Sequence, residues 1–417
     1  MMAATMDAGH DVLPSRRAAW QGAQRILAVR LDQLGDVMMT TPALAALKHG
    51  APHRHVTLLA SRSGAALAPH LPVDAVIEAA VPWMKPDQPL DAQGLAALTD
   101  ELRARGFDAA VIFTVHSQNP LPAALLCYQA GIALRAAHCR ENPYHLLTDR
   151  LPEQEPQLGI RHEVERQLAL VQALGFDLPD PRLQFTVRDG DRHALTRTLR
   201  ALGAPKSGPY IVLHAGASAA SRRYPPERFG AALRLLTQRT PLPVFLTGSA
   251  EESDLVRTVL AHAGPQGGAG DRLHDGGAGD RLHDLSGRLT LGELGALIGG
   301  AQLLISNNSG PVHLAAALGT PVVDLYALTN PQHTPWQVPH RVLYHDVPCR
   351  YCMKSVCPQQ HNDCLRRVAP SEVAEAALQL LHSRGRTRAR APLSGLPRYR
   401  ARDEQRGVQP IVVHAAA

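Results

Sequence analysis

The feature that most constrains the fold is an alternation of short apolar strands with helices, which occurs twice along the chain. In the first series we expect strands at 26–30, 56–60, 74–79 and 108–114, with helices at 41–48, 90–105 and 162–174. After a Gly- and Pro-containing stretch at 203–209, the second has strands at 210–214, 243–247, 302–306 and 321–326, with helices at 226–236, 251–261, 291–299, 311–318 and 371–382. Strands alternating with helices of this length indicate βαβ units and a parallel sheet. The sequence therefore predicts an α/β protein with two doubly wound, Rossmann-like domains.

The 417 residues divide into five expected regions. A chain of this length is too long for one ordinary domain and comfortable for two. The expected regions are a disordered N-terminal extension (1–24), a first Rossmann-like domain (25–195), a second one (196–383) with a Gly-rich insert (264–284), and a basic disordered tail (384–417).

The net charge of +6 is concentrated in the tail. Residues 383–406 contain eight Arg, one Asp and one Glu, so the rest of the chain is close to neutral. Such a tail is expected to be solvated, or else to contact an anionic membrane surface. A nearly neutral body, in a chain with only 4% aromatic residues, argues against a nucleic-acid reader.

Neither a membrane span nor a secretory signal is expected. No run approaches the roughly 20 apolar residues that cross a bilayer, and the first 24 residues have no signal-type apolar core. We therefore expect a cytoplasmic protein, in which six cysteines do not form a disulfide scaffold.

The Gly-rich insert contains a tandem repeat, GGAGDRLHD at 267–275 and again at 276–284. Two copies do not make a solenoid. We interpret the repeat as a duplication in a mobile surface loop, since lengthening a loop costs little entropy. Cation binding by its Asp side chains is the alternative.

A first candidate site lies in RLDQLGDVMMTTP at 30–42. This segment follows a strand and opens a helix, so it lies at the edge where doubly wound folds bind ligands. Gly35 permits a tight turn, and Asp36 and Thr41 are candidate site residues. Asp36 either caps the helix, with Asp32 a solvated loop acid, or acts as a base that takes a proton from a hydroxyl.

A second candidate site lies in HAGAS at 214–218 and the following SRRYPPERF at 221–229. Small residues such as Ser218 let backbone N–H groups approach a phosphate, and Arg222 offers bidentate hydrogen bonds to its oxygens. The alternative is an ordinary loop with two solvated arginines.

A third candidate site lies in ISNNSGPVHLAAALGTP at 305–321. Ser309 and Gly310 would present free N–H groups at a helix start, which is an anion-binding arrangement. His313 lies one turn further on. It either points to the same anion or is a half-buried structural residue.

Together these segments resemble glycosyltransferase family 9, the ADP-heptose:lipopolysaccharide heptosyltransferases and their relatives. The resemblance runs from about 26 to about 381 and is carried by NNSGPVHLAAALGTP, LGDVMMTTPAL and RRYPPERF. It implies a GT-B fold with two domains facing across a cleft. It also implies an inverting transfer of a sugar, heptose from ADP-heptose, to a hydroxyl of a lipopolysaccharide-core or related envelope glycan. The implied partners are a nucleotide-sugar donor, a glycolipid acceptor and the cytoplasmic face of the inner membrane.

The resemblance also assigns roles to single residues. Asp36 matches the family's general base, and Arg222 stands where the family usually has a phosphate-binding Lys. Gly310 and His313 match the diphosphate-binding loop and helix, and Asn308 stands where characterised heptosyltransferases have Asp. Glu251 looks like the acid near the ribose. Because no DxD motif is evident, we expect no metal ligands and no required cofactor, although a divalent cation is compatible with the pattern.

Two further classes share this architecture. A GT-B nucleotide-sugar epimerase would need no acceptor, and a non-catalytic nucleotide-sugar binding protein would need no base.

Four cysteines lie close together in the sequence, at 349, 352, 357 and 364, with His361 between the last two. Their spacing is irregular for a zinc ribbon or finger. A structural metal, redox-labile thiols and simple packing all remain open.

Overall fold

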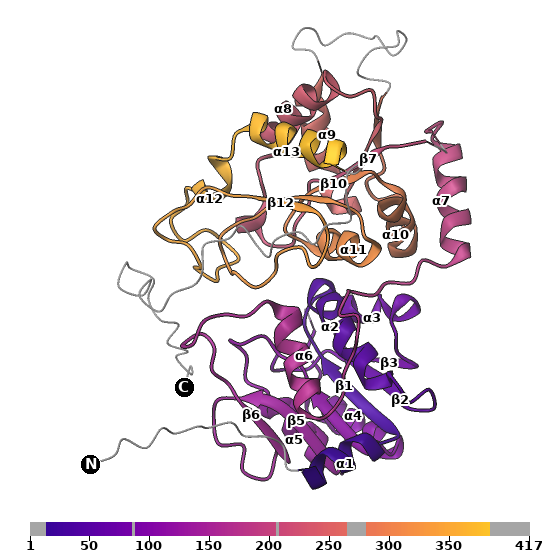
Figure 1. The fold of residues 1–417 in the computed structure, drawn as a ribbon, viewed down its shortest axis with the longest axis vertical. Coiled ribbons are helices and arrows are strands. Elements are labelled where there is room, and N and C mark those ends of the chain that lie inside the picture. Colours follow the sequence, from indigo (N-terminus) through magenta and orange to yellow (C-terminus); the bar gives the residue numbers. More distant parts are fainter. Residues whose placement is uncertain (1–13, 86–87, 206–207, 265–280, 384–417) are drawn as a thin grey trace. The chain divides into compact units, whose positions relative to one another are not determined.

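The computed structural model describes residues 14–85, 88–205, 208–264 and 281–383. The chain divides into two compact units, Met1–Pro181 and Arg182–Ala417. Each unit contains a six-stranded parallel sheet with helices packed on it (Figure 1). The predicted α/β class with two doubly wound units is confirmed.

The first unit has the strand order β3-β2-β1-β4-β5-β6. Its strands are β1 (Arg25–Arg30), β2 (His55–Ala60), β3 (Ala75–Glu78), β4 (Ala109–Ile112), β5 (Leu134–Cys139) and β6 (Asp149–Pro152). Its helices are α1 (Pro14–Gly22), α2 (Leu34–Lys48), α3 (Arg62–Ala65), α4 (Ala92–Ala104), α5 (Leu121–Gln129) and α6 (Glu163–Ala173). The chain builds outward from β1 to β3 and then returns to add β4 on the other side of β1. The strand order therefore reverses between β1 and β4.

The second unit has the order β12-β11-β10-β7-β8-β9. Its strands are β7 (Ile211–His214), β8 (Val244–Thr247), β9 (Leu282–Asp284), β10 (Leu303–Asn307), β11 (Val322–Leu325) and β12 (His340–Leu343). Its helices are α7 (Asp189–Ala201), α8 (Pro226–Thr237), α9 (Ser253–Ala263), α10 (Leu291–Gly300), α11 (Gly310–Leu318), α12 (Asp363–Arg366) and α13 (Pro370–Ser383). Here the order reverses between β7 and β10.

Both cores are formed by the apolar faces of the central strands. Leu27, Val29 and Ile112 are fully buried in the first unit, as are Ile211 and Ile305 in the second. Helices cover both faces of a parallel sheet, which explains why these strands read as continuous apolar runs.

The division between the units falls earlier than the expected boundary at 195/196. Helix α7 and the residues before it pack on α10, where glycines make room for them. A Cβ atom at Gly295 would lie 2.5 Å from the Phe185 ring, and one at Gly292 would lie 2.3 Å from a carboxylate oxygen of Asp191. This packing assigns residues 182–195 to the second unit.

The expectation of a disordered extension at 1–24 is wrong for residues 14–24. Helix α1 buries the side chain of Trp20 completely, and the indole Nε1 donates to Asp149 Oδ2 at 3.0 Å. Arg16 donates to the carbonyl of Thr148 at 2.6 Å. These contacts with residues at the start of β6 join positions 132 and 129 residues apart in the sequence, so no local sequence pattern predicts them. Residues 1–13 lie outside the described residues.

The expected insert at 264–284 ends earlier than the sequence suggested. Its last three residues form β9, which pairs in parallel with β8. Arg281 precedes this strand and donates to the carbonyls of Thr240 and Thr237 at 2.8 and 3.1 Å. The rest of the insert, 265–280, and the expected tail at 384–417 lie outside the described residues.

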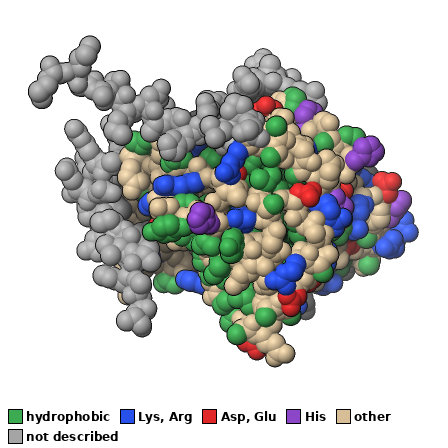
Figure 2. All heavy atoms as spheres, turned by 90° about the horizontal axis from the view of Figure 1, so that it is seen from below, with side chains coloured by type: hydrophobic (Ala, Val, Ile, Leu, Met, Phe, Trp, Pro, Cys, Tyr) green, Lys and Arg blue, Asp and Glu red, His purple; other side chains and the backbone are tan. Residues whose placement is uncertain are grey.

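The face drawn in Figure 2, seen from below relative to Figure 1, carries basic, acidic and apolar side chains among one another, in keeping with a nearly neutral composition outside the tail. Among the described residues, no helix combines the length and the apolar character that crossing a membrane requires.

The burial of Trp20 predicts that Trp20→Ala lowers the free energy of unfolding by about 3–5 kcal/mol, as large-to-small core substitutions do. Urea denaturation followed by circular dichroism measures this change. Leu158→Ala is the control, because Leu158 is 77% exposed and its loss is expected to change stability by less than about 0.5 kcal/mol. Equal effects of the two substitutions would show that α1 does not stabilise the first unit.

Candidate functional site

The three motifs identified in the sequence lie at the two points where strand order reverses. The segment 31–36 follows β1 and the loop 113–118 follows β4. In the second unit, the loop 215–223 follows β7 and Asn308 and Ser309 follow β10. In open parallel sheets, ligands bind outside the carboxyl ends of the strands at such reversal points. We call the polar residues at the reversal point of the first unit the first half-site, and those at the reversal point of the second unit the second half-site.

The first half-site is organised by Arg30, a fully buried cation at the end of β1. Its guanidinium lies 2.9 Å from Glu163 Oε1, 3.1 Å from Asp32 Oδ2 and 3.4 Å from Asp36 Oδ1. Burial opposes the charge, but the three carboxylates outweigh it and raise the pKa of Arg30 above its ordinary value. Sequence reasoning missed Arg30 and Glu163. Glu163 begins α6, 133 residues from Arg30 in the chain, so only the fold brings them together.

The capping interpretation of Asp36 is wrong, since Gln33 occupies the N-cap position of α2 and Asp36 lies in the first turn. Asp32 is not a solvated loop acid. It is buried and accepts a hydrogen bond from Gln118 Nε2 at 2.5 Å. The side chain of Asp36 is 18% exposed, against 11% for Asp32 and 1% for Glu163. Asp36 is thus the most accessible of the three acids.

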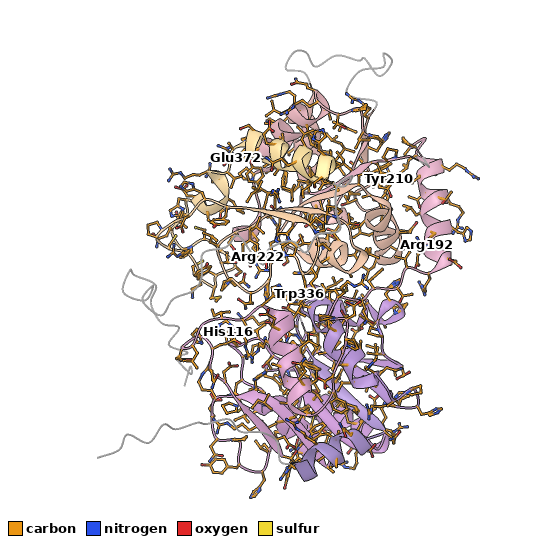
Figure 3. The ribbon with its side chains drawn as sticks, in the orientation of Figure 1. His116, Arg192, Tyr210, Arg222, Trp336 and Glu372 are labelled. Atoms are coloured by element: carbon orange, nitrogen blue, oxygen red, sulfur yellow. The ribbon has the colours of Figure 1, made fainter. Side chains whose placement is uncertain are left out.

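His116 lies on the loop after β4 and is labelled in Figure 3. Burial and the nearby guanidinium of Arg166 lower the pKa of this histidine, while Glu163 partly opposes the change. Its imidazole is therefore neutral near pH 7. The sequence analysis did not select His116, which lies on the loop that also brings Gln118 to Asp32.

Two residues proposed from the first motif have other roles. Gly35 is the second residue of α2 and so lies within a helix rather than in a turn. Thr41 is fully buried, and its hydroxyl donates to the carbonyl of Met38 at 2.7 Å. Residues five apart in a helix point about 140° away from each other. Thr41 therefore does not share the face of Asp36.

The second half-site contains two adjacent cations with different surroundings. Arg223 Nε donates to the carbonyl of Ala217 at 2.7 Å, so it holds its own loop. Arg222 Nε is buried and makes no hydrogen bond to any described residue. Figure 3 shows Arg222 on this loop. Of the two, Arg222 is the better placed to bind an anion. Ser218 lies exposed on the same loop.

Asn307, at the end of β10, links the two loops of this half-site. Its Nδ2 donates to the carbonyl of Ala215 at 2.6 Å, and its Oδ1 accepts from the N–H of Tyr224 at 2.9 Å. Ser309 Oγ donates to the carbonyl of Asn307 at 3.1 Å. Sequence reasoning passed over Asn307, although its position at a strand end in a polar loop was visible.

Helix α11 begins three residues after this asparagine. Ser309 occupies its N-cap position and Gly310 is its first residue. The first N–H groups of a helix have no partner within the helix, and its dipole favours anions there. His313 is buried one turn in. Its ring lies edge-on to that of His333, with the centroids 6.4 Å apart.

The structure places Glu252, not Glu251, against the loop after β7. A Cβ atom at Gly216 would lie 2.1 Å from a carboxylate oxygen of Glu252, so the absent side chain leaves room for this acid. Glu252 Oε2 accepts from the N–H of Ser249 at 2.9 Å and lies 4.0 Å from His214 Nε2. Glu251 is exposed, and hydrogen bonding to Ser249 lowers its pKa.

The family model of glycosyltransferase family 9 (heptosyltransferase) matches residues 95–362. This match covers more than half of the chain and includes the second half-site. The chain belongs to glycosyltransferase family 9.

Relatives within the family match over most of their length. The chain is 26% identical to lipopolysaccharide heptosyltransferase 2 of Escherichia coli K12 over 320 residues, which cover 75% of this chain and 85% of that protein. It is 27% identical to lipopolysaccharide heptosyltransferase 1 of Pseudomonas aeruginosa over 370 residues, covering 84% and 96%. A shorter match, to lipooligosaccharide heptosyltransferase 2 of Campylobacter jejuni, is 35% identical over 99 residues and covers 23% and 31%. The protein is a glycosyltransferase.

Solved structures show the same fold. The crystal structure of a family 9 glycosyltransferase from Veillonella parvula has a TM-score of 0.67 at 22% identity, covering 86% of this chain and 97% of that one. The structure of E. coli ADP-heptose lps heptosyltransferase II has a TM-score of 0.65 at 23% identity, covering 87% and 99%. Both likenesses establish the architecture of the glycosyltransferase.

The segment 349–364 of this family 9 protein, called the cysteine segment, holds the loop after β7 and the loop after β11. Ser221, next to Arg222, donates from its hydroxyl to the carbonyl of Lys354 at 2.8 Å and from its N–H to the carbonyl of Ser355 at 3.0 Å. The N–H groups of Tyr351 and Met353 donate to the carbonyls of Leu328 and Thr329 at 2.6 and 2.7 Å.

The thiols of this segment are free. Cys349 Sγ lies 3.8 Å from His361 Nε2, and burial raises the pKa of Cys364 to about 11. Within the described ranges, no three His, Cys, Asp or Glu side chains are grouped so that they could hold a metal ion.

Because Arg30 neutralises buried acids, Arg30→Met is expected to cost about 3–5 kcal/mol of unfolding free energy, as removal of one partner from a buried ion pair does. The cost should be smaller at pH 5 than at pH 8, because protonation of a carboxyl relieves the repulsion that Arg30 had balanced.

Urea titrations at the two pH values measure both effects. Arg103→Met removes an exposed ion pair with Asp100 and should cost at most about 1 kcal/mol. A cost for Arg30→Met no greater than that of this control would mean that the acids do not depend on Arg30.

Proposed function

We propose that this glycosyltransferase moves heptose, with inversion, from ADP-heptose to a hydroxyl of a lipopolysaccharide-core glycan. The proposal is supported by the names of relatives that match over most of their length. The observation that carries it is the chemistry at the two reversal points. The first unit presents an accessible carboxylate there, and the second unit presents a cation beside a helix N-terminus.

The second half-site is suited to the diphosphate of the donor. Arg222 would supply planar, charge-assisted hydrogen bonds to phosphate oxygens, which Arg forms better than Lys. The Ser309 and Gly310 amides at the start of α11 would bind further oxygens. Negative charge grows on the leaving phosphate in the transition state, so preorganised donors of this kind accelerate the transfer. His313 would stand behind these groups, and Glu252 or Glu251 would contact the ribose.

The first half-site is suited to activating the acceptor. In an inverting transfer, one base removes the proton of the attacking hydroxyl while one clamp stabilises the leaving group. Asp36 is the best candidate base because it is the most exposed of the three acids and has the longest contact with Arg30. Glu163 and Asp32 are held by Arg30 and by the side chains of Gln167 and Gln118. This division of roles needs no divalent cation.

If Asp36 is the base, Asp36→Asn should lower kcat by about 10²–10⁴-fold, the usual contribution of general base catalysis. Affinity for ADP should stay within about twofold, because the nucleotide is assigned to the other unit. The assay measures transfer of labelled sugar from ADP-heptose to core lipopolysaccharide, and isothermal titration calorimetry measures ADP binding. Asp100→Asn on α4 is the control for loss of an exposed carboxylate. Turnover close to that of the unaltered enzyme would remove Asp36 from this role.

If Arg222 binds the diphosphate, Arg222→Met should weaken ADP binding by about 10–100-fold, corresponding to the roughly 1.5–3 kcal/mol of a hydrogen bond to a charged group. Arg222→Lys should lose less, since it keeps the charge. Calorimetric titration with ADP, GDP and UDP measures these affinities and tests the choice of base. Arg192→Met is the matched control, because Arg192 points outward from α7 (Figure 3). Unchanged ADP affinity in Arg222→Met would place the diphosphate elsewhere.

Omitting the acceptor separates the proposed transfer from the alternatives. A transferase consumes donor only with acceptor present, whereas an epimerase converts it without one and a binding protein does neither.

A further inference from the structure

Asp324 is a carboxyl buried in the interior of a sheet, and the proposed reaction assigns it no task. It lies on β11, between β10 and β12, and has no exposed surface. Its neighbours along the strand are Val323 and Leu325, both fully buried. Burying a carboxyl among apolar groups is costly unless it has partners. Its presence therefore calls for a physical reason.

The hydrogen-bonding partner of Asp324 is the asparagine that precedes the proposed donor-binding amides. Asn308 Nδ2 donates to Asp324 Oδ2 and to the carbonyl of His333, each at 2.9 Å. These two bonds use both hydrogens of the amide group. The backbone N–H of Asn308 also donates to the carbonyl of Leu325 at 3.2 Å. Asn308 is thus fixed to β11 immediately before Ser309.

His333, whose carbonyl accepts from the Asn308 amide, connects the Asn308–Asp324 pair to α11. Asn330 Nδ2 lies 2.9 Å from His333 Nδ1, and Tyr326 Oη donates to the carbonyl of Asn330 at 2.7 Å. The ring of His333 in turn packs edge-on against that of His313. Displacement of Asn308 would therefore affect both the start of α11 and its first turn.

The second carboxyl oxygen of Asp324 has a different environment. Oδ1 is buried and makes no hydrogen bond to any residue that the structure describes. Burial raises the pKa of Asp324 to about 8, and the hydrogen bond from Asn308 only partly offsets this.

The titratable groups near the pair are Tyr326 at the end of β11, His333 after it and His313 on α11. Burial raises the pKa of Tyr326, Asp324 raises it further, and Arg222 opposes the change. Among the described residues no ion pair is formed by Asp324.

We propose that Asp324 is a positioning residue that holds the donor-binding loop through Asn308, and that it does so as a neutral acid. The inference rests on the proposed donor site in the second unit. A neutral carboxyl accepts the amide hydrogen through Oδ2 without placing a buried negative charge beside a loop that binds a diphosphate. The same reasoning accounts for an amide at position 308, since an Asp there would place two carboxyls within about 3 Å, where they would have to share a proton.

Ionisation of Asp324 should therefore weaken donor binding. Protonation and ADP binding are linked, and such couplings are typically about 5–150-fold. We expect ADP affinity to fall by about tenfold as the pH rises from 7 to 9.5. By the same linkage, ADP binding at pH 8 should take up protons.

The pH dependence of stability has a defined sign. The pKa of Asp324 in the folded protein is raised above its ordinary value of 3.8. Its contribution to the free energy of unfolding is therefore complete at pH values below 3.8. The contribution is lost as the pH rises through about 8.

The test is calorimetric titration of the full-length protein with ADP at pH 7 and 9.5, in buffers of different ionisation enthalpy. Asp324→Asn keeps an oxygen that can accept from Asn308 but cannot ionise. We expect it to bind ADP more tightly than Asp324→Ala at pH 7, without the alkaline loss and without proton uptake. Asp324→Ala should bind ADP at least about fivefold more weakly at both pH values. Asn308→Asp should move the loss of affinity to a different pH, which keeps the test decisive even if Asp324→Ala does not fold.

The outcomes distinguish the two proposals. If the unaltered protein binds no ADP, GDP or UDP, the proposed donor site fails. If it binds ADP but Asp324→Asn shows the same pH dependence and proton uptake, or Asp324→Ala keeps full affinity, the positioning role is overturned while the donor site stands.

Discussion

The reversal of strand order in each sheet is the constraint on which the rest of the structure depends. Each unit adds strands outward from one central strand and then returns to the other side of it, so the segments leaving the two central strands diverge. Polar groups can gather only at that divergence without disrupting a sheet buried on both faces. Asp36, Arg222 and the start of α11 all lie there. The cost is that these strand ends are themselves buried, and their polar groups must satisfy one another.

The two units meet this requirement with opposite chemistry. In the first, one cation, Arg30, faces three carboxylates, which leaves an acidic excess, and Asp36 is the most exposed of the three acids. In the second, the side-chain amides of two asparagines hold the loops in place through hydrogen bonds. Asn307 and Asn308 bond to backbone groups and to the buried carboxyl of Asp324. The acidic groups of the first unit and the cation of the second are the kinds of group that the proposed base and the proposed diphosphate site require.

The sequence predicted the central elements well because each one carries its own signal. Strands β1, β7 and β10 are apolar runs, and the predicted positions agree with the structure to within a residue or two. Contacts between distant segments carry no such signal. Trp20 with Asp149 and Arg30 with Glu163 are each separated by about 130 residues. Local pattern was misleading for Thr41, which is buried and lies on a different face of α2 from Asp36. Local pattern also did not show that Glu252 packs against the loop after β7 while Glu251 is exposed.

The cysteine segment shows why a polar, irregular stretch belongs beside such a site. Its backbone carbonyls hold Ser221, next to Arg222, while its N–H groups hold Leu328 and Thr329 on the loop that carries His333. Tyr351 and Met353 adopt positive φ angles of 61° and 52°, which turn these N–H groups toward that loop. The bridge is therefore made by main chain, and burial raises the pKa of Cys349 and Cys364 above the ordinary value of a thiol. The cysteine segment also connects the loop that carries Arg222 to the loop that carries His333, whose carbonyl accepts from Asn308 Nδ2.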